Sequence, residues 1–200
     1  MSMLRLFIAI SLPPSIVRNL EGILKELKLR LPGRSVRWVP AGNIHLTLKF
    51  LGDVSSARLE SLAQTLGAEA LRHPSFEIGV SGLGCFPSAS RPRVLWVGVQ
   101  APDGLAVLQR SVDAQLQRSG YPPEERPFSP HLTLGRIGRD AGPEDFQRIR
   151  AVLSAYQPQP LGVCRVEAVH IYRSDLQPGG AVYTRLSSAP LGAPDQTRET

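Results

Sequence analysis

The sequence predicts an α+β fold in which two pseudo-symmetric lobes, each an antiparallel β-sheet with helices on its outer face, enclose a central cleft. The first observation is a repeated tetrapeptide, because His-Leu-Thr-Leu occurs at 45–48 and again 86 positions later at 131–134. The second is that strand and helix patterns follow one another in the same order before and after the middle of the chain. Two copies are too few for a solenoid, so we expect one duplicated domain over residues 1–188.

The first copy begins with an apolar run at 4–12, which is typical of a buried strand. Pro13 and Pro14 then open a helix, since proline is favoured at the first helical position and the following apolar residues recur at helical spacing. The same patterns predict the other elements of this copy, which are strands at 36–39, 44–51 and 76–86 and a helix at 57–71.

The second copy opens with a strand at 93–99, rich in Val, Leu and Trp. Asp103 can cap a helix that Gly120 ends, and residues 121–130, with four prolines, form an ordered turn or loop. The pattern then predicts a strand at 131–137, a helix opened by Pro143, and strands at 163–172 and 181–186 joined through Pro178-Gly179-Gly180. Residues 189–200 are small and polar, and we expect them to form a flexible tail.

The composition is that of a chain of 200 residues with 42% hydrophobic residues, which is enough to bury a core. The apolar run at 4–12 is too short to span a bilayer and lacks a small-residue cleavage site, so we expect no membrane association. Cys85 and Cys164 stand alone, which favours core thiols in a reducing cytoplasm. The net charge of +6 favours an anionic partner but is by itself weak support for nucleic acid.

The tetrapeptides are the candidate site. On a β-strand, side chains alternate between faces, so each histidine and threonine point the same way while the leucines point into a core. A single His-x-Thr is usually the solvated side of a sheet. Chance gives only about 0.12 such triplets in a chain of this composition, so two copies indicate a function. Facing each other across a cleft, they would form a platform for a small anionic group.

Two histidines and two threonines suit displacement at phosphorus. Because imidazole titrates near pH 6.5, one ring can take a proton from water while the other gives one to a leaving oxygen. Threonine hydroxyls can donate hydrogen bonds to the non-bridging oxygens. The motifs contain no carboxylate, which argues against glycosidase chemistry, and neither Cys nor a third His, so we expect no metal and no cofactor. We expect His73 and His170 to have surface or packing roles.

Six segments carry a more specific signal. They read RLFIAI (5–10), RWV (37–39), HLTLKFLG (45–52), GLGCFP (82–87), RPRVLW (91–96) and RPFSPHLTLGR (126–136). Over residues 4–186 the sequence therefore resembles the bacterial and archaeal RNA 2′,3′-cyclic phosphodiesterases, once called 2′-5′ RNA ligases, of the two-histidine phosphoesterase superfamily.

This resemblance implies an enzyme that hydrolyses the 2′,3′-cyclic phosphate at an RNA 3′ end to a 2′-phosphate, without a metal. His45 would be the proton donor to the departing 3′ oxygen and His131 the proton acceptor that activates water. Thr47 and Thr133 would hold phosphate oxygens. Run backwards, with a 5′-hydroxyl in place of water, the same chemistry would make a 2′-5′ linkage. The implied partners are RNA ends or cyclic nucleotides, and we expect a monomer with no obligate protein partner.

For three residues near the motifs, the face to which the side chain points depends on whether the strand alternates regularly. Arg136 is a further phosphate-binding position by resemblance, yet five residues after His131 a regular strand points it to the opposite face unless Gly135 supplies a bulge. Lys49 lies on the catalytic face by alternation and could contact phosphate or RNA, or be a solvated lysine. Phe50 shares the alternation of the motif leucines and is expected in the core.

Other functions fit parts of the same pattern. Arg91 and Arg93 could line the cleft, although surface positions are favoured. An enzyme that opens small cyclic nucleotides or trims RNA 3′ ends would use the same residues. A nucleotide-binding or RNA-binding module would keep the cleft without the chemistry, but pure binding does not require a pair of imidazoles at both motifs.

Overall fold

A computed structural model describes residues 2–177 and 180–193 of the chain. Its strands are β1 (Met3–Ile10), β2 (Val36–Trp38), β3 (Leu46–Ser55), β4 (Phe76–Phe86), β5 (Val94–Gln100), β6 (His131–Ile137), β7 (Gly162–Val166), β8 (Ala168–Gln177) and β9 (Gly180–Pro190). Its α-helices are α1 (Pro14–Arg30), α2 (Leu59–Ala70), α3 (Asp103–Arg118) and α4 (Pro143–Ala155). The predicted order of strands and helices is confirmed, except that the strand expected at 163–172 is two strands.

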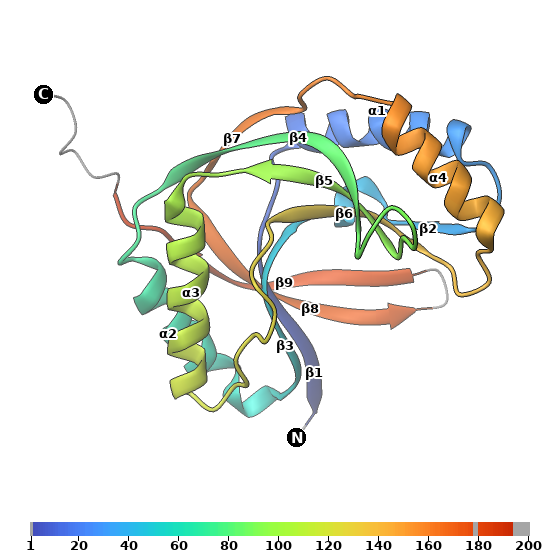
Figure 1. Ribbon diagram of the computed structural model, residues 1–200. Coiled ribbons are helices and arrows are strands. Elements are labelled where there is room, and N and C mark those ends of the chain that lie inside the picture. Colours follow the sequence, from blue (N-terminus) through green and yellow to red (C-terminus); the bar gives the residue numbers. More distant parts are fainter. Residues whose placement is uncertain (1, 178–179, 194–200) are drawn as a thin grey trace, which may run out of the picture.

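The strands form one continuous sheet in the order β7-β4-β5-β6-β3-β1-β8-β9, with β2 paired to β6. All the strand pairs are antiparallel. The sheet is strongly curled, and β3 meets β6 at one residue pair, Leu46 and Leu132 (Figure 1). This junction divides the sheet. We call the half made of β3, β1, β8 and β9 the first lobe, and the half made of β6, β5, β4 and β7, with β2, the second lobe.

Two helices cover the outer face of each lobe. In the first lobe, α2 packs against β8 and β9, and α3 packs against β3 and α2. In the second lobe, α1 contacts β7 and lies beside α4, where the Arg30 guanidinium stands 4.5 Å from the ring centre of Tyr156 (Figure 1). Each lobe therefore combines elements from both copies of the repeat. The predicted α+β fold is confirmed, although the two expected sheets are joined into one.

The core lies between the sheet and the helices. The four motif leucines, Leu46, Leu48, Leu132 and Leu134, are all buried in it, as the alternation of the strands predicts. Each helix contributes an apolar stripe to the same core. Among the described residues no helix is long and apolar enough to cross a membrane.

Several element boundaries differ from the prediction. The first motif strand begins at Leu46, because a short 3-10 turn at Ala41–Asn43 leads into it, and it continues to Ser55. The single strand expected at 163–172 is two strands, which separate at Glu167 as the chain passes from the second lobe to the first.

The segment expected to be a tail from residue 189 is part of the fold as far as it is described. β9 runs to Pro190, and Ala189 and Leu191 are buried. The amide of Gly192 donates to the His73 carbonyl at 2.8 Å, and Ser75 donates back to Gly192 at 3.2 Å. Small residues fit here because this segment packs closely against the end of α2. Composition alone does not reveal this packing, so the small residues by themselves predict a tail. The rest of the expected tail, 194–200, lies outside the described residues.

Both motif strands contain a bulge at the same place. Along β1 and β3, Ile8 pairs with Lys49 and Ala9 pairs with Thr47, so Leu48 is an extra residue in β3. Along β5 and β6, the neighbours of Trp96 and Leu95 are Thr133 and Gly135, so Leu134 is the extra residue. Each bulge follows its threonine and reverses the alternation of the residues beyond it.

We predict that Gly135→Ala lowers the free energy of unfolding. A Cβ at this position would lie 2.8 Å from Cγ1 of Val36 and 3.2 Å from the Trp38 ring, because β2 crosses close beside the bulge. Overpacking of this kind costs about 1–3 kcal/mol, measurable by urea denaturation.

Gly22→Ala in α1 is the matched control. Nothing lies within 4 Å of its added methyl group, so this variant should be unchanged or about 0.4–1 kcal/mol more stable. Equal stability of the two variants would contradict the close packing of β2 on β6.

Candidate active site

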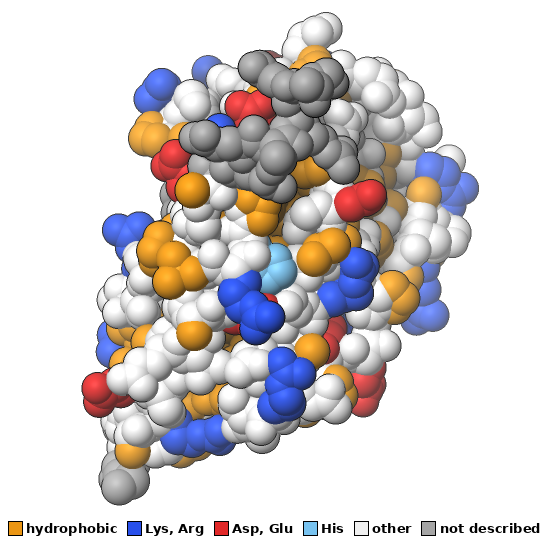
Figure 2. All heavy atoms as spheres, turned by 90° about the vertical axis from the view of Figure 1, so that its left-hand side faces the viewer, with side chains coloured by type: hydrophobic (Ala, Val, Ile, Leu, Met, Phe, Trp, Pro, Cys, Tyr) orange, Lys and Arg blue, Asp and Glu red, His pale blue; other side chains and the backbone are white. Residues whose placement is uncertain are grey.

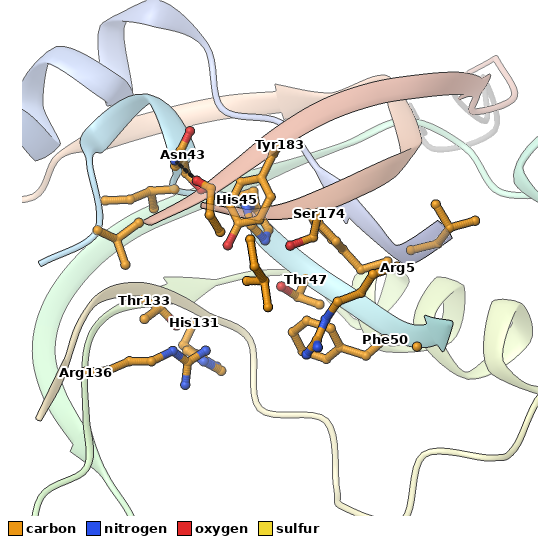
Figure 3. Close-up of a pocket in the computed structure, with 17 residues that line it drawn as sticks. Arg5, Asn43, His45, Thr47, Phe50, His131, Thr133, Arg136, Ser174 and Tyr183 are labelled. Carbon is orange, nitrogen blue, oxygen red and sulfur yellow. Dashed lines mark hydrogen bonds between the residues drawn. The ribbon is translucent and has the colours of Figure 1, made fainter. Parts of the chain in front are cut away.

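The two motifs converge on one cavity of about 560 Å³ on the concave side of the sheet. His45 and Thr47 reach it from the first lobe, and His131 and Thr133 from the second (Figure 3). The convergence of the two His-x-Thr pairs across one cleft, which the repeat predicts, is therefore present in the structure.

The two imidazoles are held in the same way. The Nδ1 atom of His45 donates to the carbonyl of Asn43 at 2.8 Å, and Nδ1 of His131 donates to the carbonyl of Ser129 at 2.8 Å. A carbonyl only accepts, so this bond assigns a proton to each Nδ1. It leaves Nε2 of both rings as the nitrogen that a ligand in the cavity can use.

The surroundings of the two rings differ. His45 stacks on Phe7 with ring centres 4.6 Å apart and meets the edge of Tyr183 at 5.1 Å. Burial among these rings lowers the pKa of His45 below its ordinary value of 6.5, and the hydrogen bond to Asn43 opposes this only in part. His131 meets Phe86 edge to face at 5.0 Å. The site is thus symmetric in its hydrogen bonds and asymmetric in its enclosure.

The two threonines are free to bind a ligand. Both are half-buried, and neither hydroxyl has a hydrogen-bond partner within the described part of the chain. Two unengaged hydroxyls beside two imidazoles can donate to the oxygens of a tetrahedral anion.

Arg136 lines the cavity, because the bulge at Leu134 turns it onto the face that carries Thr133. The possibility that a bulge next to Gly135 returns Arg136 to the catalytic face is therefore confirmed in its placement. Its side chain is exposed on that face.

The expected place of Lys49 on the catalytic face is wrong. Lys49 is only 2% exposed, and its Nζ donates to the Asp113 carboxylate of α3 and to the carbonyl of Pro122 at 2.7 Å. The bulge at Leu48 turns it away from the cavity. Asp113 also accepts from the Glu124 amide at 3.2 Å, so Lys49 ties β3 to α3 and to the loop that leads into β6.

The expected place of Phe50 in the core is wrong for the same reason. Phe50 is 60% exposed and lines the cavity, at the position in its strand that Arg136 holds in the other. The sequence reasoning also missed other residues of the lining, among them Arg5, Phe7 and Tyr183. The alternation of Arg5 and Phe7 along β1 is a signal that could have placed both on one face, whereas Tyr183 comes from β9 and has no local signal.

The remaining candidates lie elsewhere. Neither Arg91 nor Arg93 is among the residues that line the cavity. His73 bonds Glu69 at 3.2 Å, and His170 is buried and bonds Ser188 at 3.0 Å, in agreement with packing roles. Across residues 2–177 and 180–193, no three His, Cys, Asp or Glu side chains come together as a metal-binding group.

The comparison with known families agrees with the duplicated architecture. The family model described as LigT like Phosphoesterase matches the chain twice, over residues 10–96 and 97–183. The chain therefore belongs to the LigT-like phosphoesterase family.

Its relatives are similar over most of their length. The RNA 2′,3′-cyclic phosphodiesterase of Methanothermobacter thermautotrophicus is 34% identical over 182 residues, which cover 91% of this chain and 96% of that protein. The protein of the same name from Escherichia coli is 38% identical over 138 residues, 68% of this chain and 74% of that one. The crystal structure of E. coli LigT complexed with 3′-AMP has a TM-score of 0.73 and 32% identity, covering 95% of this chain and 99% of that chain.

We predict that Lys49→Met destabilises the fold by about 3 kcal/mol, because it leaves the Asp113 carboxylate without its buried partner. Urea denaturation measures this. In the double variant with Asp113→Leu, part of the loss should return, since no charge is then left unpaired. Lys25→Met on the exposed side of α1 is the control and should stay within about 0.5 kcal/mol of wild type. A similarly small change for Lys49→Met would contradict the role assigned to the pair.

We predict that His45 titrates below pH 6.5 in the free protein, as followed by NMR of its ring nitrogens. Since the folded state favours the neutral ring, the stabilisation from this group is present above pH 6.5 and is lost as the pH falls through the lowered folded pKa. Phe7→Ala exposes the ring and should move the midpoint upward. A midpoint at or above 6.5 in wild type would refute the effect of burial.

Proposed function

We propose that this protein hydrolyses the 2′,3′-cyclic phosphate at an RNA 3′ end to a 2′-phosphate by histidine acid–base catalysis that needs no metal. The observation that carries the proposal is the convergence of two Nδ1-anchored imidazoles and two unengaged threonine hydroxyls on one cavity. The names of the relatives, RNA 2′,3′-cyclic phosphodiesterase, support the same reaction.

The reaction is a displacement at phosphorus. Nε2 of His131 takes a proton from the attacking water, and a new bond forms between the water oxygen and phosphorus. The bond from phosphorus to the 3′ oxygen breaks, and Nε2 of His45 gives that oxygen a proton. The bond to the 2′ oxygen remains, so the product is a 2′-phosphate. Thr47, Thr133 and Arg136 donate to the non-bridging oxygens, where negative charge increases.

The lowered pKa of His45 fits the donor role once substrate is present. A phosphodiester anion next to the ring favours the imidazolium and raises its pKa again. Beside the same anion, a ring enclosed by Phe7 and Tyr183 stays a stronger acid than a solvated ring would be, so its proton passes more readily to the leaving oxygen.

The nucleoside of the substrate binds at the first-lobe end of the cavity in this proposal. Phe50 presents an exposed aromatic face there, and single-stranded RNA bases stack on such faces. The crystal structure of E. coli LigT complexed with 3′-AMP supports the proposal that a nucleotide binds to this fold.

With a 5′-hydroxyl in place of water, the reverse reaction would form a 2′-5′ linkage. We further propose a monomer that works in the cytoplasm.

The test is an oligoribonucleotide ending in a 2′,3′-cyclic phosphate, assayed with EDTA present. Wild type should make the 2′-phosphate product, identified by ³¹P NMR, with a bell-shaped dependence of kcat/KM on pH. His45→Ala and His131→Ala should each lose at least about a hundredfold in kcat, as expected for a general acid or base, and Thr47→Val or Thr133→Val should lose about 10²–10³-fold if each removes one donor to the developing charge.

His73→Ala is the matched control, since His73 lies outside the cavity and should leave the rate unchanged. A 3′-phosphate product, loss of turnover with EDTA, or full activity in both cavity-histidine variants would each refute the proposal. Tight nucleotide binding with no turnover would instead support a binding module.

A further inference from the structure

Two arginines stand side by side at one end of the cavity. Arg37 of β2 is the direct cross-strand partner of Arg136 of β6. Directly opposed residues of an antiparallel pair project from the same face, with Cβ atoms about 4.5–5.5 Å apart. Arg136 lines the cavity, and so does Val39, two residues beyond Arg37. Arg37 therefore projects from the cavity face of the sheet, at the rim next to Arg136.

This pair lacks the acidic partner that two other strand arginines have. Arg173 pairs with Asp175 at 2.7 Å and Arg165 with Glu167 at 3.7 Å. In the portion of the chain that is described, the side chains of Arg37 and Arg136 make neither an ion pair nor a hydrogen bond, and both are exposed.

Opposed like charges destabilise a sheet. An anion bound between two guanidinium groups turns this repulsion into attraction and can take charge-assisted hydrogen bonds from both.

A ribonucleotide 3′ end has a matching order of groups. Its 2′,3′-cyclic phosphate bridges C2′ and C3′, which lie between C1′, which carries the base, and C4′, which carries C5′ and through its oxygen the 5′-phosphodiester. The base and the preceding phosphodiester therefore leave the reacting phosphate in opposite directions. The cavity shows the same order, with the exposed ring of Phe50 at one end, the histidines between, and Arg136 at the other end (Figure 3).

We infer that Arg37 binds the phosphodiester on the 5′ side of the terminal nucleotide together with Arg136, whose guanidinium group bridges from that phosphodiester to the reacting phosphate. The inference rests on the proposed function and names its substrate class, an RNA chain of at least two nucleotides in preference to a cyclic mononucleotide. Hydrolysis of the terminal phosphate itself does not require Arg37, which lies outside the cavity lining. The opposed arginine pair is explained by contact with the next phosphate along the strand.

The face over α2 and α3 is a less suitable track for RNA. There, lysine and arginine side chains are interspersed with acidic and apolar ones (Figure 2). The rim of the cavity brings two arginines together directly beside the reacting centre, and binding there would place the strand in register with the histidines.

The experiment compares kcat/KM on a dinucleotide with a terminal 2′,3′-cyclic phosphate and on the matching cyclic mononucleotide. Wild type should prefer the dinucleotide by roughly tenfold or more, as expected for charge-assisted bonds to one phosphate. Arg37→Gln should remove most of this preference. Arg34→Gln, which removes another exposed charge three residues earlier, is the matched control and should keep the preference.

A substrate with a neutral methylphosphonate in place of the internal phosphodiester tests the same contact by changing the RNA and not the protein. It should reduce the dinucleotide preference of wild type and have little further effect in Arg37→Gln. A wild type with equal kcat/KM on both substrates, or an Arg37→Gln variant that loses equally on both, would overturn the inference while leaving the hydrolysis itself in place. A wild type that cleaves neither substrate would overturn the proposed function, and this subsite with it.

Discussion

The extra residue directly after the threonine of each motif strand determines which side chains reach the cavity. In a regular strand, Thr47 and Lys49 would share a face, and Arg136 would point away from Thr133. The bulges at Leu48 and Leu134 reverse this order, so Phe50 and Arg136 reach the cavity while Lys49 and Gly135 turn inward. Without the bulges the imidazoles would still converge, but the groups that hold the rest of a nucleotide would not.

The two halves stabilise their equivalent bulges by different means. In the second lobe the carbonyl of Leu134 accepts a hydrogen bond from the Val39 amide at 2.8 Å, so β2 completes the ladder. In the first lobe the carbonyl of Leu48 is reached by the Gln109 side chain of α3 at 3.5 Å, and Lys49 pairs with Asp113 one turn further along that helix. Duplication thus kept the geometry of the strand while the supporting contacts diverged, and the equivalent cavity positions carry an aromatic ring, Phe50, in one half and a guanidinium group, Arg136, in the other.

Sequence alone predicted the fold class, the order of elements, the buried leucines and the convergence of the four motif residues. These follow from periodicity and from the repeat, which are local signals. The positions of Lys49 and Phe50 could not be predicted. Side chains alternate between faces only while a strand stays regular, and neither residue type indicates that a bulge precedes it. Tyr183 and the end of β9 were missed because long-range pairing places them, and small residues such as Ala189 carry no pattern that shows which helix they pack against.

The account depends on both imidazoles acting on a single phosphorus atom. The most direct measurement is a crystal structure with a nucleoside oxovanadium complex, whose five-coordinate centre imitates phosphorus during displacement. We expect Nε2 of His45 and Nε2 of His131 within about 3.2 Å of its two opposite apical oxygens, with the threonine hydroxyls on the equatorial ones. A complex that engages one histidine alone, or both on the same side of the vanadium, would contradict the account.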